Sequence, residues 1–286
     1  MKTKSRALES ALVHALLVVA VVYALYPVLW VLSLALSKTG ATEARVLPIP
    51  HGLSDVTLDH FRFVMGLRDA GRTSLFWRQV ANSLLVSGAT ALTAVALATP
   101  TAYALARFDF VGKRTGIRAM LLTQMFPGVA SAVPLYLILD VLRLLDTASG
   151  LVLVYAATAV PFAIFQLKGA FLAIPVDLEE AAMVDGATRF QAFVRVALPA
   201  ARPAIAVTAL FAFMSAWNEF TLAATLLGRE RAFTLPVVLQ SYVGEYSTNW
   251  GAFAAGAVLV SVPVMALFYV AQRQLLSGLT AGGVKG

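Results

Sequence analysis

The chain contains 286 residues, of which 59% are hydrophobic and only 13% are charged, whereas about a quarter of the residues of an ordinary soluble domain are charged. Its mean hydropathy is +0.80, and its formal net charge is +7, from 22 Lys and Arg against 15 Asp and Glu. This composition excludes a typical water-soluble enzyme and predicts that the lipid bilayer, and no nucleic acid, is the anionic partner. Because the chain has no cysteine, disulfides, thiolate metal sites and a cysteine nucleophile are also excluded.

Long apolar segments predict where the chain crosses the membrane. About 20 helical residues span the roughly 30 Å hydrocarbon core of a bilayer. Six segments are long enough and carry almost no charge: 10–37, 79–106, 119–139, 147–166, 203–227 and 246–272. The first is too long for the apolar part of a cleavable signal peptide, so we predict that it is retained. The predicted fold class is therefore an all-α integral membrane protein with six transmembrane helices.

The distribution of basic residues predicts the orientation. A cytoplasmic N-terminus places most Lys and Arg on the cytoplasmic side, including those of the short basic segment 107–118. We expect a multi-pass protein of the cytoplasmic (inner) membrane with both termini cytoplasmic. The predicted domains are 1–78, with the first span and an extracytoplasmic loop, 79–272, with spans two to six, and the cytoplasmic tail 273–286.

A polar segment between the fourth and fifth spans, residues 175–203, is predicted to form two short helices joined by a turn. It carries helix-capping residues in the order that such a pair requires: Asp177, Glu180, Gly186, Thr188 and Gln191. The first two and the last two have the spacing of capping boxes, and the glycine between them can end the first helix.

This segment offers a surface on which another protein could dock. Ala181 and Ala182 permit close approach, and Phe190 and Phe193 are predicted to be exposed aromatic anchors for a groove in the partner. The alternative is a helical loop that only lies on the membrane surface.

Several motifs resemble one known family. Glu180-Ala181-Ala182, followed by Gly186 and later by Leu198-Pro199, is similar to the EAA loop of ABC-importer permeases. Further segments resemble the carbohydrate-uptake branch in the same order along the chain: Tyr103-Ala104-Leu105-Ala106-Arg107-Phe108, Met125-Phe126-Pro127, Pro134-Leu135-Tyr136, Pro161-Phe162 and Trp217-Asn218-Glu219-Phe220. The resemblance extends from about residue 78 to the end and implies the helical bundle of a type I ABC-importer permease.

The resemblance also implies which residues meet an ATPase. In that family the EAA loop docks into a cleft of the ATPase subunit, which implies coupling roles for Glu180, Ala181, Ala182, Asp185, Gly186, Phe190, Leu198 and Pro199. The last residues resemble the tail of maltose-transporter permeases, which implies a second ATPase contact through Gly278, Thr280, Gly282, Gly283 and Lys285. The loop 228–251 resembles a loop that enters the sugar cleft of the binding protein, although its aromatic residues also suit an interfacial belt.

Two other classes of function are conceivable for such a chain: an ion-coupled secondary carrier and an intramembrane enzyme. An ion-coupled secondary carrier needs carboxylates within the membrane, and Glu219, next to Asn218, is the one candidate. These two residues could either line a substrate path or make structural hydrogen bonds. An intramembrane enzyme is disfavoured because the three histidines match no catalytic motif, and no phosphate-binding P-loop is present.

The resemblance implies a sugar permease without catalytic residues, metal or cofactor of its own. ATP and Mg²⁺ would bind to the partner ATPase, present in two copies, and a second permease subunit would complete the pore. An extracytoplasmic sugar-binding protein would deliver the substrate, which we expect to be maltose, maltodextrin or a related α-glucoside such as trehalose.

Overall fold

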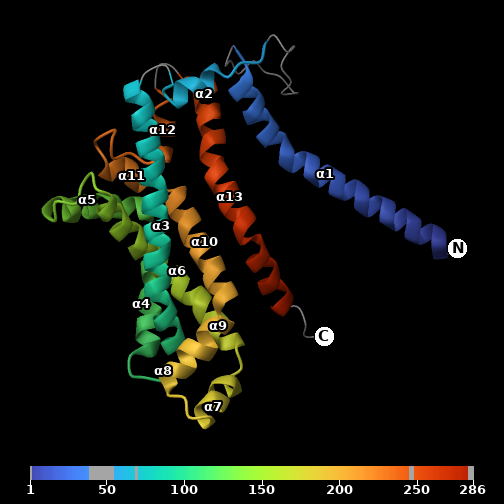
Figure 1. Cartoon of the computed structure of the whole chain (residues 1–286), viewed down its shortest axis with the longest axis vertical. Helices are drawn as coiled ribbons and strands as arrows, with labels where there is room; N and C mark the ends of the chain where they lie inside the picture. Colours follow the sequence, from blue (N-terminus) through green and yellow to red (C-terminus); the bar gives the residue numbers. More distant parts are fainter. Residues whose placement is uncertain (1, 39–54, 68–69, 245–247, 283–286) are drawn as a thin grey trace. The chain divides into compact units, whose positions relative to one another are not determined.

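The computed structural model describes residues 2–38, 55–67, 70–244 and 248–282, which are almost entirely helical (Figure 1). They divide into two compact units, Met1–Phe76 with Val238–Val262 and Trp77–Val237 with Pro263–Gly286. In the described part of the chain, β pairing is confined to two isolated bridges, Ser37 with Val56 and Val243 with Thr248. The all-α prediction is therefore confirmed.

The first unit contains two complete helices, α1 (Lys2–Leu36) and α2 (Asp59–Val64). It also contains the first residues of α3 (Ala70–Arg107), the second half of α12 (Leu235–Gln240) and the first part of α13 (Trp250–Gly282). The Nε2 atom of His60 lies 3.0 Å from the carbonyl oxygen of Ser37, which ties α2 to the end of α1.

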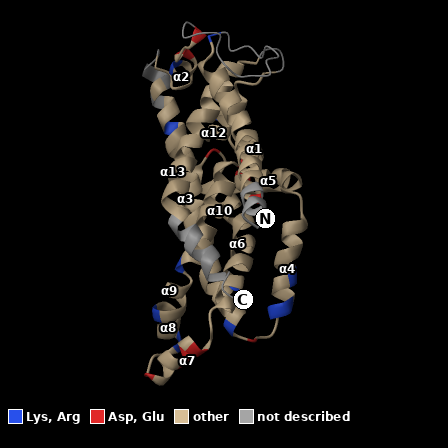
Figure 2. Ribbon diagram, turned by 90° about the vertical axis from the view of Figure 1, so that its right-hand side faces the viewer, with Lys and Arg blue, Asp and Glu red and all other residues tan. Residues whose placement is uncertain are grey.

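The second unit contains the rest of α3 and the remaining helices. They are α4 (Lys113–Met125), a 3₁₀ turn (Gly128–Ser131), α5 (Ala132–Val141), α6 (Ala148–Ala173), α7 (Asp177–Val184), α8 (Arg189–Ala192), a π-helical turn (Phe193–Ala197), α9 (Leu198–Ala200), α10 (Arg202–Trp217) and α11 (Thr221–Leu226). Within this unit several basic residues lie around the ends of α4, α8 and α9, whereas the middle parts of α3, α6 and α10 carry almost no charge (Figure 2). This distribution suits helices that cross a bilayer.

Among the described residues, four helices are long and apolar enough to be continuous membrane spans: Glu9–Leu36, Leu75–Arg107, Ala148–Ala173 and Trp250–Gln272. Two further spans are possible only as bent helix pairs, which gives up to 6 in all. The predicted third span is such a pair, because α4 and the segment Gly128–Val141 meet at 94°. The span predicted over 119–139 is therefore broken rather than one continuous helix.

Proline chemistry explains this break. Pro127 lacks a backbone N–H and disfavours the helical conformation of the residue before it, and Phe126 is extended, with φ −79° and ψ 127°. The predicted fifth span, 203–227, also departs from one straight helix. Helix α10 ends at Trp217, and α11 begins only at Thr221.

Small residues allow the helices of the second unit to pack closely around α6. One buried cluster near α7 and α8 contains Ala98 and Ala102 of α3, Leu167 and Phe171 of α6, and Ala197. Because the small side chain of alanine lets the backbones of neighbouring helices approach closely, these helices pack tightly at the point where the loop after α6 begins.

Candidate functional site

The segment that follows α6 and reaches the first two residues of α10, residues 175–203, is called the coupling loop. Its first helix, α7, ends in a Schellman turn: the N–H of Gly186 donates to the carbonyl of Met183 (3.1 Å), and the N–H of Ala187 donates to that of Ala182 (3.0 Å). Gly186 has φ +91°, in the left-handed region that favours glycine. The predicted glycine stop is confirmed.

The second helix begins with the predicted capping box. Thr188 Oγ1 accepts a hydrogen bond from the N–H of Gln191 (3.2 Å), and Gln191 Oε1 accepts one from the N–H of Thr188 (2.8 Å). The α-helical hydrogen bonding then changes to a π-helical turn over Phe193–Ala197 before α9.

The predicted cap at Asp177 is wrong. The N-cap position of α7 is Val176, whose φ of −65° and ψ of −32° are already helical, and no side chain caps this end. Because the chain turns into the helix directly after Pro175, Asp177 lies inside the first turn with Glu179 and Glu180. There the three carboxylates favour the positive end of the helix dipole.

Most predicted coupling residues are exposed on α7, on α8 and on the turn between them. Glu180, Ala181, Asp185 and Gly186 are exposed, and the side chain of Phe190 is 73% exposed. The other three are half-buried: Ala182, Leu198 and Pro199. The coupling loop therefore presents apolar and acidic side chains that other parts of the described chain leave exposed.

Beneath this surface lies a buried clamp that the sequence analysis missed. Glu179 is only 4% exposed, and its carboxylate accepts hydrogen bonds from the Tyr103 hydroxyl (2.5 Å) and from Arg107 Nε (2.7 Å). Arg107 Nη2 also donates to the carbonyl of Ile174 (2.9 Å). The side chains of Arg107 and Glu179 are 8% and 6% exposed, so this ion pair is shielded from water.

Aromatic packing extends the clamp to the second half of the loop. The ring of Tyr103 lies 4.4 Å from that of Phe193 and 5.5 Å from that of Phe171, measured between centroids. The guanidinium of Arg189 lies 5.8 Å from the centre of the Phe108 ring, a cation–π distance. Phe193 is thus half-buried against α3, which corrects the prediction that it is an exposed anchor.

The membrane carboxylate Glu219 is held by hydrogen bonds within the chain. Its Oε2 accepts from the Tyr155 hydroxyl (2.8 Å) and from the N–H of Ala223 (3.1 Å), and its Oε1 accepts from the N–H of Leu222 (2.9 Å). It therefore caps α11 and ties it to α6. The neighbouring Asn218 is exposed and donates to the carbonyl of Met214 (2.9 Å).

Replacing Glu219 with glutamine is expected to destabilise the protein without making uptake depend on an ion gradient. One amide oxygen cannot accept from all three donors, and an unsatisfied buried donor costs about 1–3 kcal/mol. Thermal unfolding in detergent and transport with and without an ion gradient measure the two effects, and Asn218→Ala serves as the exposed control. A loss of transport at unchanged stability would instead place Glu219 on the substrate path.

The remaining predicted contact residues are less fully described. Gly278, Thr280 and Gly282 belong to the last turns of α13, whereas Gly283 and Lys285 lie outside the described residues. The loop 228–251 is described except for residues 245–247.

Residues 94–280 match the family of inner membrane components of binding-protein-dependent transport systems. The chain belongs to this family. It is a permease subunit, which carries the membrane path of a transporter, rather than an enzyme.

Among similar proteins, the permease shares 39% identity with the trehalose transport system permease SugB of Mycobacterium tuberculosis, over 92% of this chain and 93% of that protein. It shares 36% identity with the maltose/maltodextrin transport system permease MalG of Escherichia coli, over 99% of this chain and 98% of that protein. Its fold also matches a chain of a bacterial ABC transporter that imports the acidic polysaccharide alginate, with a TM-score of 0.74, 27% identity and coverage of 94% and 97%. The type I permease fold is thereby confirmed.

Proposed function

We propose that the permease forms part of an ABC importer that carries a sugar into the cell, with maltose, maltodextrin or another α-glucoside such as trehalose as the substrate. The support comes from the permeases it resembles, whose names refer to trehalose and to maltose and maltodextrin. The observation that carries the coupling role is the exposed face of α7 and α8, held to α3 by the buried clamp of Tyr103, Arg107 and Glu179.

The proposed assembly has five parts. A MalF-like second permease completes the pore, two copies of a MalK-like ATPase bind ATP and Mg²⁺, and an extracytoplasmic sugar-binding protein delivers the substrate. The permease itself binds no cofactor. In this assembly the coupling loop and both termini face the cytoplasm, and Gly278, Thr280, Gly282, Gly283 and Lys285 form a second contact with the ATPases.

In this proposal the coupling loop transmits movement from the ATPases to the helices of the pore. ATP binding brings the two ATPases together and moves the exposed face of α7 and α8 with them. Because Glu179 and Phe193 fix the loop to α3, the loop transmits this movement as a rigid body instead of bending. The helices of the pore then change from an inward-open to an outward-open arrangement.

Co-purification from native membranes in mild detergent tests the proposal. We expect a second permease and an ATPase in the same complex, whose ATP hydrolysis after reconstitution rises with binding protein plus maltose, maltodextrin or trehalose. A chain that purifies alone and transports on an ion gradient would contradict it. Hydrolysis that responds to none of the three sugars would contradict the α-glucoside assignment alone.

A further inference from the structure

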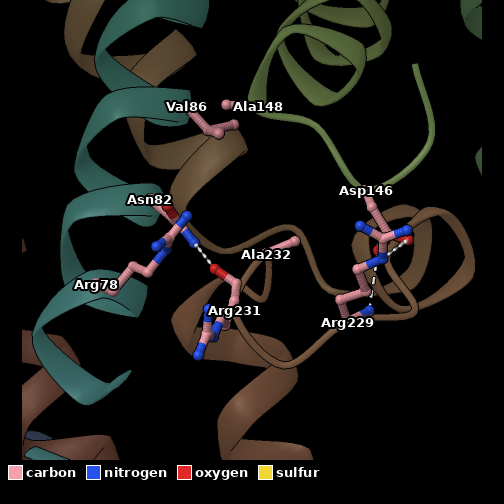
Figure 3. Close-up of a pocket in the computed structure, with 8 residues that line it drawn as sticks. All are labelled: Arg78, Asn82, Val86, Asp146, Ala148, Arg229, Arg231 and Ala232. Carbon is pink, nitrogen blue, oxygen red and sulfur yellow. Dashed lines mark hydrogen bonds and ion pairs between the residues drawn. The ribbon is translucent and has the colours of Figure 1, made fainter. Parts of the chain in front are cut away.

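A pocket with an unbalanced positive charge lies at the end of the second unit opposite the coupling loop. It has a volume of about 430 Å³ and is lined by Arg78, Asn82, Val86, Asp146, Ala148, Arg229, Arg231 and Ala232 (Figure 3). The helices α7 and α8 lie at one end of this unit, whereas α11, directly before the arginine-rich loop 228–234, lies toward the other end (Figure 1). In the proposed orientation the pocket therefore opens to the extracytoplasmic side.

One wall of the pocket is fixed by side chains of α3. Three residues on one face of this helix bind the backbone of the loop 228–234 and the start of α12. Gln79 donates to the carbonyl of Glu230 (3.0 Å), and Asn82 donates to those of Arg231 (2.9 Å) and Phe233 (3.2 Å). The N–H of Leu235 donates to Ser83 Oγ (2.8 Å). The loop is thus held in one shape before any partner binds.

The opposite wall contains the one acidic residue that lines the pocket, and its carboxylate is already occupied. Asp146 Oδ1 accepts from the N–H groups of Gly228 (2.6 Å) and Arg229 (2.9 Å), and Oδ2 lies 3.6 Å from Arg229 Nε. Figure 3 shows this pair on one side of the pocket and the guanidinium groups of Arg78 and Arg231 on the other. Within the described residues, no carboxylate lies within ion-pair distance of Arg78 or Arg231, and both are exposed.

The position of these arginines requires an explanation, because extracytoplasmic loops generally carry few basic residues. The anionic surface that attracts basic segments belongs to the cytoplasmic leaflet, which argues against a lipid headgroup as the occupant. A carboxylate fits the guanidinium group, which can bind both of its oxygens at once. The partner that must approach this side is the binding protein on which transporters of this family depend.

We propose that Arg78 and Arg231 form a docking site for an aspartate or glutamate side chain of the extracytoplasmic binding protein. The inference rests on the proposed function, because it requires the outward orientation and the binding protein. Arg229 is already paired with Asp146 and shapes the pocket, so the two remaining arginines make the contact. Attraction between opposite charges at the edge of an interface speeds association of the two proteins, and this attraction weakens as the salt concentration rises.

Charge reversal tests the site in the complete transporter reconstituted in vesicles. The variants are Arg78→Glu, Arg231→Glu and the double variant, and the readout is the concentration of binding protein that gives half-maximal stimulation of ATP hydrolysis. We expect the double variant to raise this concentration about tenfold or more, to leave the maximal rate within about twofold, and to lose the salt dependence of the unmodified protein. Arg143→Glu is the matched control, since Arg143 is exposed on the loop before Asp146 but does not line the pocket.

The outcomes separate the docking site from its alternatives. An unchanged half-maximal concentration in the double variant, or an equal shift in Arg143→Glu, would overturn the proposal. The shift should also persist in vesicles of neutral phosphatidylcholine, and a defect seen only with anionic lipid would assign the pocket to a headgroup instead. Failure of the binding protein to stimulate the unmodified transporter would contradict the proposed function itself.

Discussion

Replacing Glu179 with glutamine is expected to uncouple ATP hydrolysis from transport while the protein still inserts into the membrane. The change leaves the Arg107 guanidinium buried without its counter-charge, and breaking a buried ion pair by removing one partner costs about 3–5 kcal/mol. The loop would then no longer be fixed to α3, so movement of the ATPases would bend the loop rather than shift the helix. Sugar uptake and stimulated ATP hydrolysis, measured on the same vesicles, detect this loss.

A matched control lies at the same end of the protein. Asp109 pairs with Lys113 at 3.0 Å, but its side chain is fully exposed, so Asp109→Asn should have almost no effect. The double variant Glu179→Gln with Arg107→Met removes both charges and should regain part of the lost stability, because no buried charge remains unpaired. Normal coupled uptake in Glu179→Gln would show that the clamp has no part in coupling.

Substitution of Gly186 is expected to impair coupling in an order set by backbone conformation alone. A Cβ at this position would meet nothing within 4 Å, so the expected effect comes from the positive φ of +91°. Asparagine tolerates the left-handed region, alanine less well, and β-branched valine is strained there. Stimulated ATP hydrolysis should therefore be highest in Gly186→Asn, lower in Gly186→Ala and lowest in Gly186→Val. The rate of Gly186→Val should be close to the unstimulated rate.

Gly112 provides the comparison for this series. It has φ +89° and is equally free of neighbours around an added Cβ, but it precedes α4 and lies outside the coupling loop. Gly112→Val should lower the thermal stability about as much as Gly186→Val and should leave stimulation intact. If both valine variants lose stimulation equally, the effect is general destabilisation and not the turn between α7 and α8.

Features set by neighbouring residues were predictable from the sequence. The capping box of Thr188 and Gln191 depends on two side chains three positions apart, and the helix stop at Gly186 depends on the backbone freedom of one glycine. Both are confirmed. The apolar segments likewise located the helices that can span a bilayer. The cap at Asp177 failed because Pro175 starts the helical turn earlier than the spacing of the carboxylates indicates.

Features set by distant residues were not predictable in this way. Tyr103 and Arg107 lie four residues apart on one face of α3, which is a usable signal, but nothing local identifies Glu179 as their partner rather than the exposed Glu180. The pocket at the other end also depends on segments far apart in the chain, with Asn82 and the carbonyl of Arg231 separated by 149 positions. The coupling residues inferred from the resemblance remain predictions until variants are measured.

The clamp also sets an order for assembly during synthesis. Arg107 and Tyr103 precede Glu179 by 72 and 76 residues, and α6 lies between them. At about 5–20 residues per second, the ribosome needs several seconds to deliver the carboxylate after the arginine. During that interval the guanidinium has no counter-charge and must stay at the aqueous surface. The end of α3 that carries Arg107 is therefore expected to settle into its final place only after the fourth span has been made, and a nascent chain cut short before Glu179 would leave this end without its ion-pair partner.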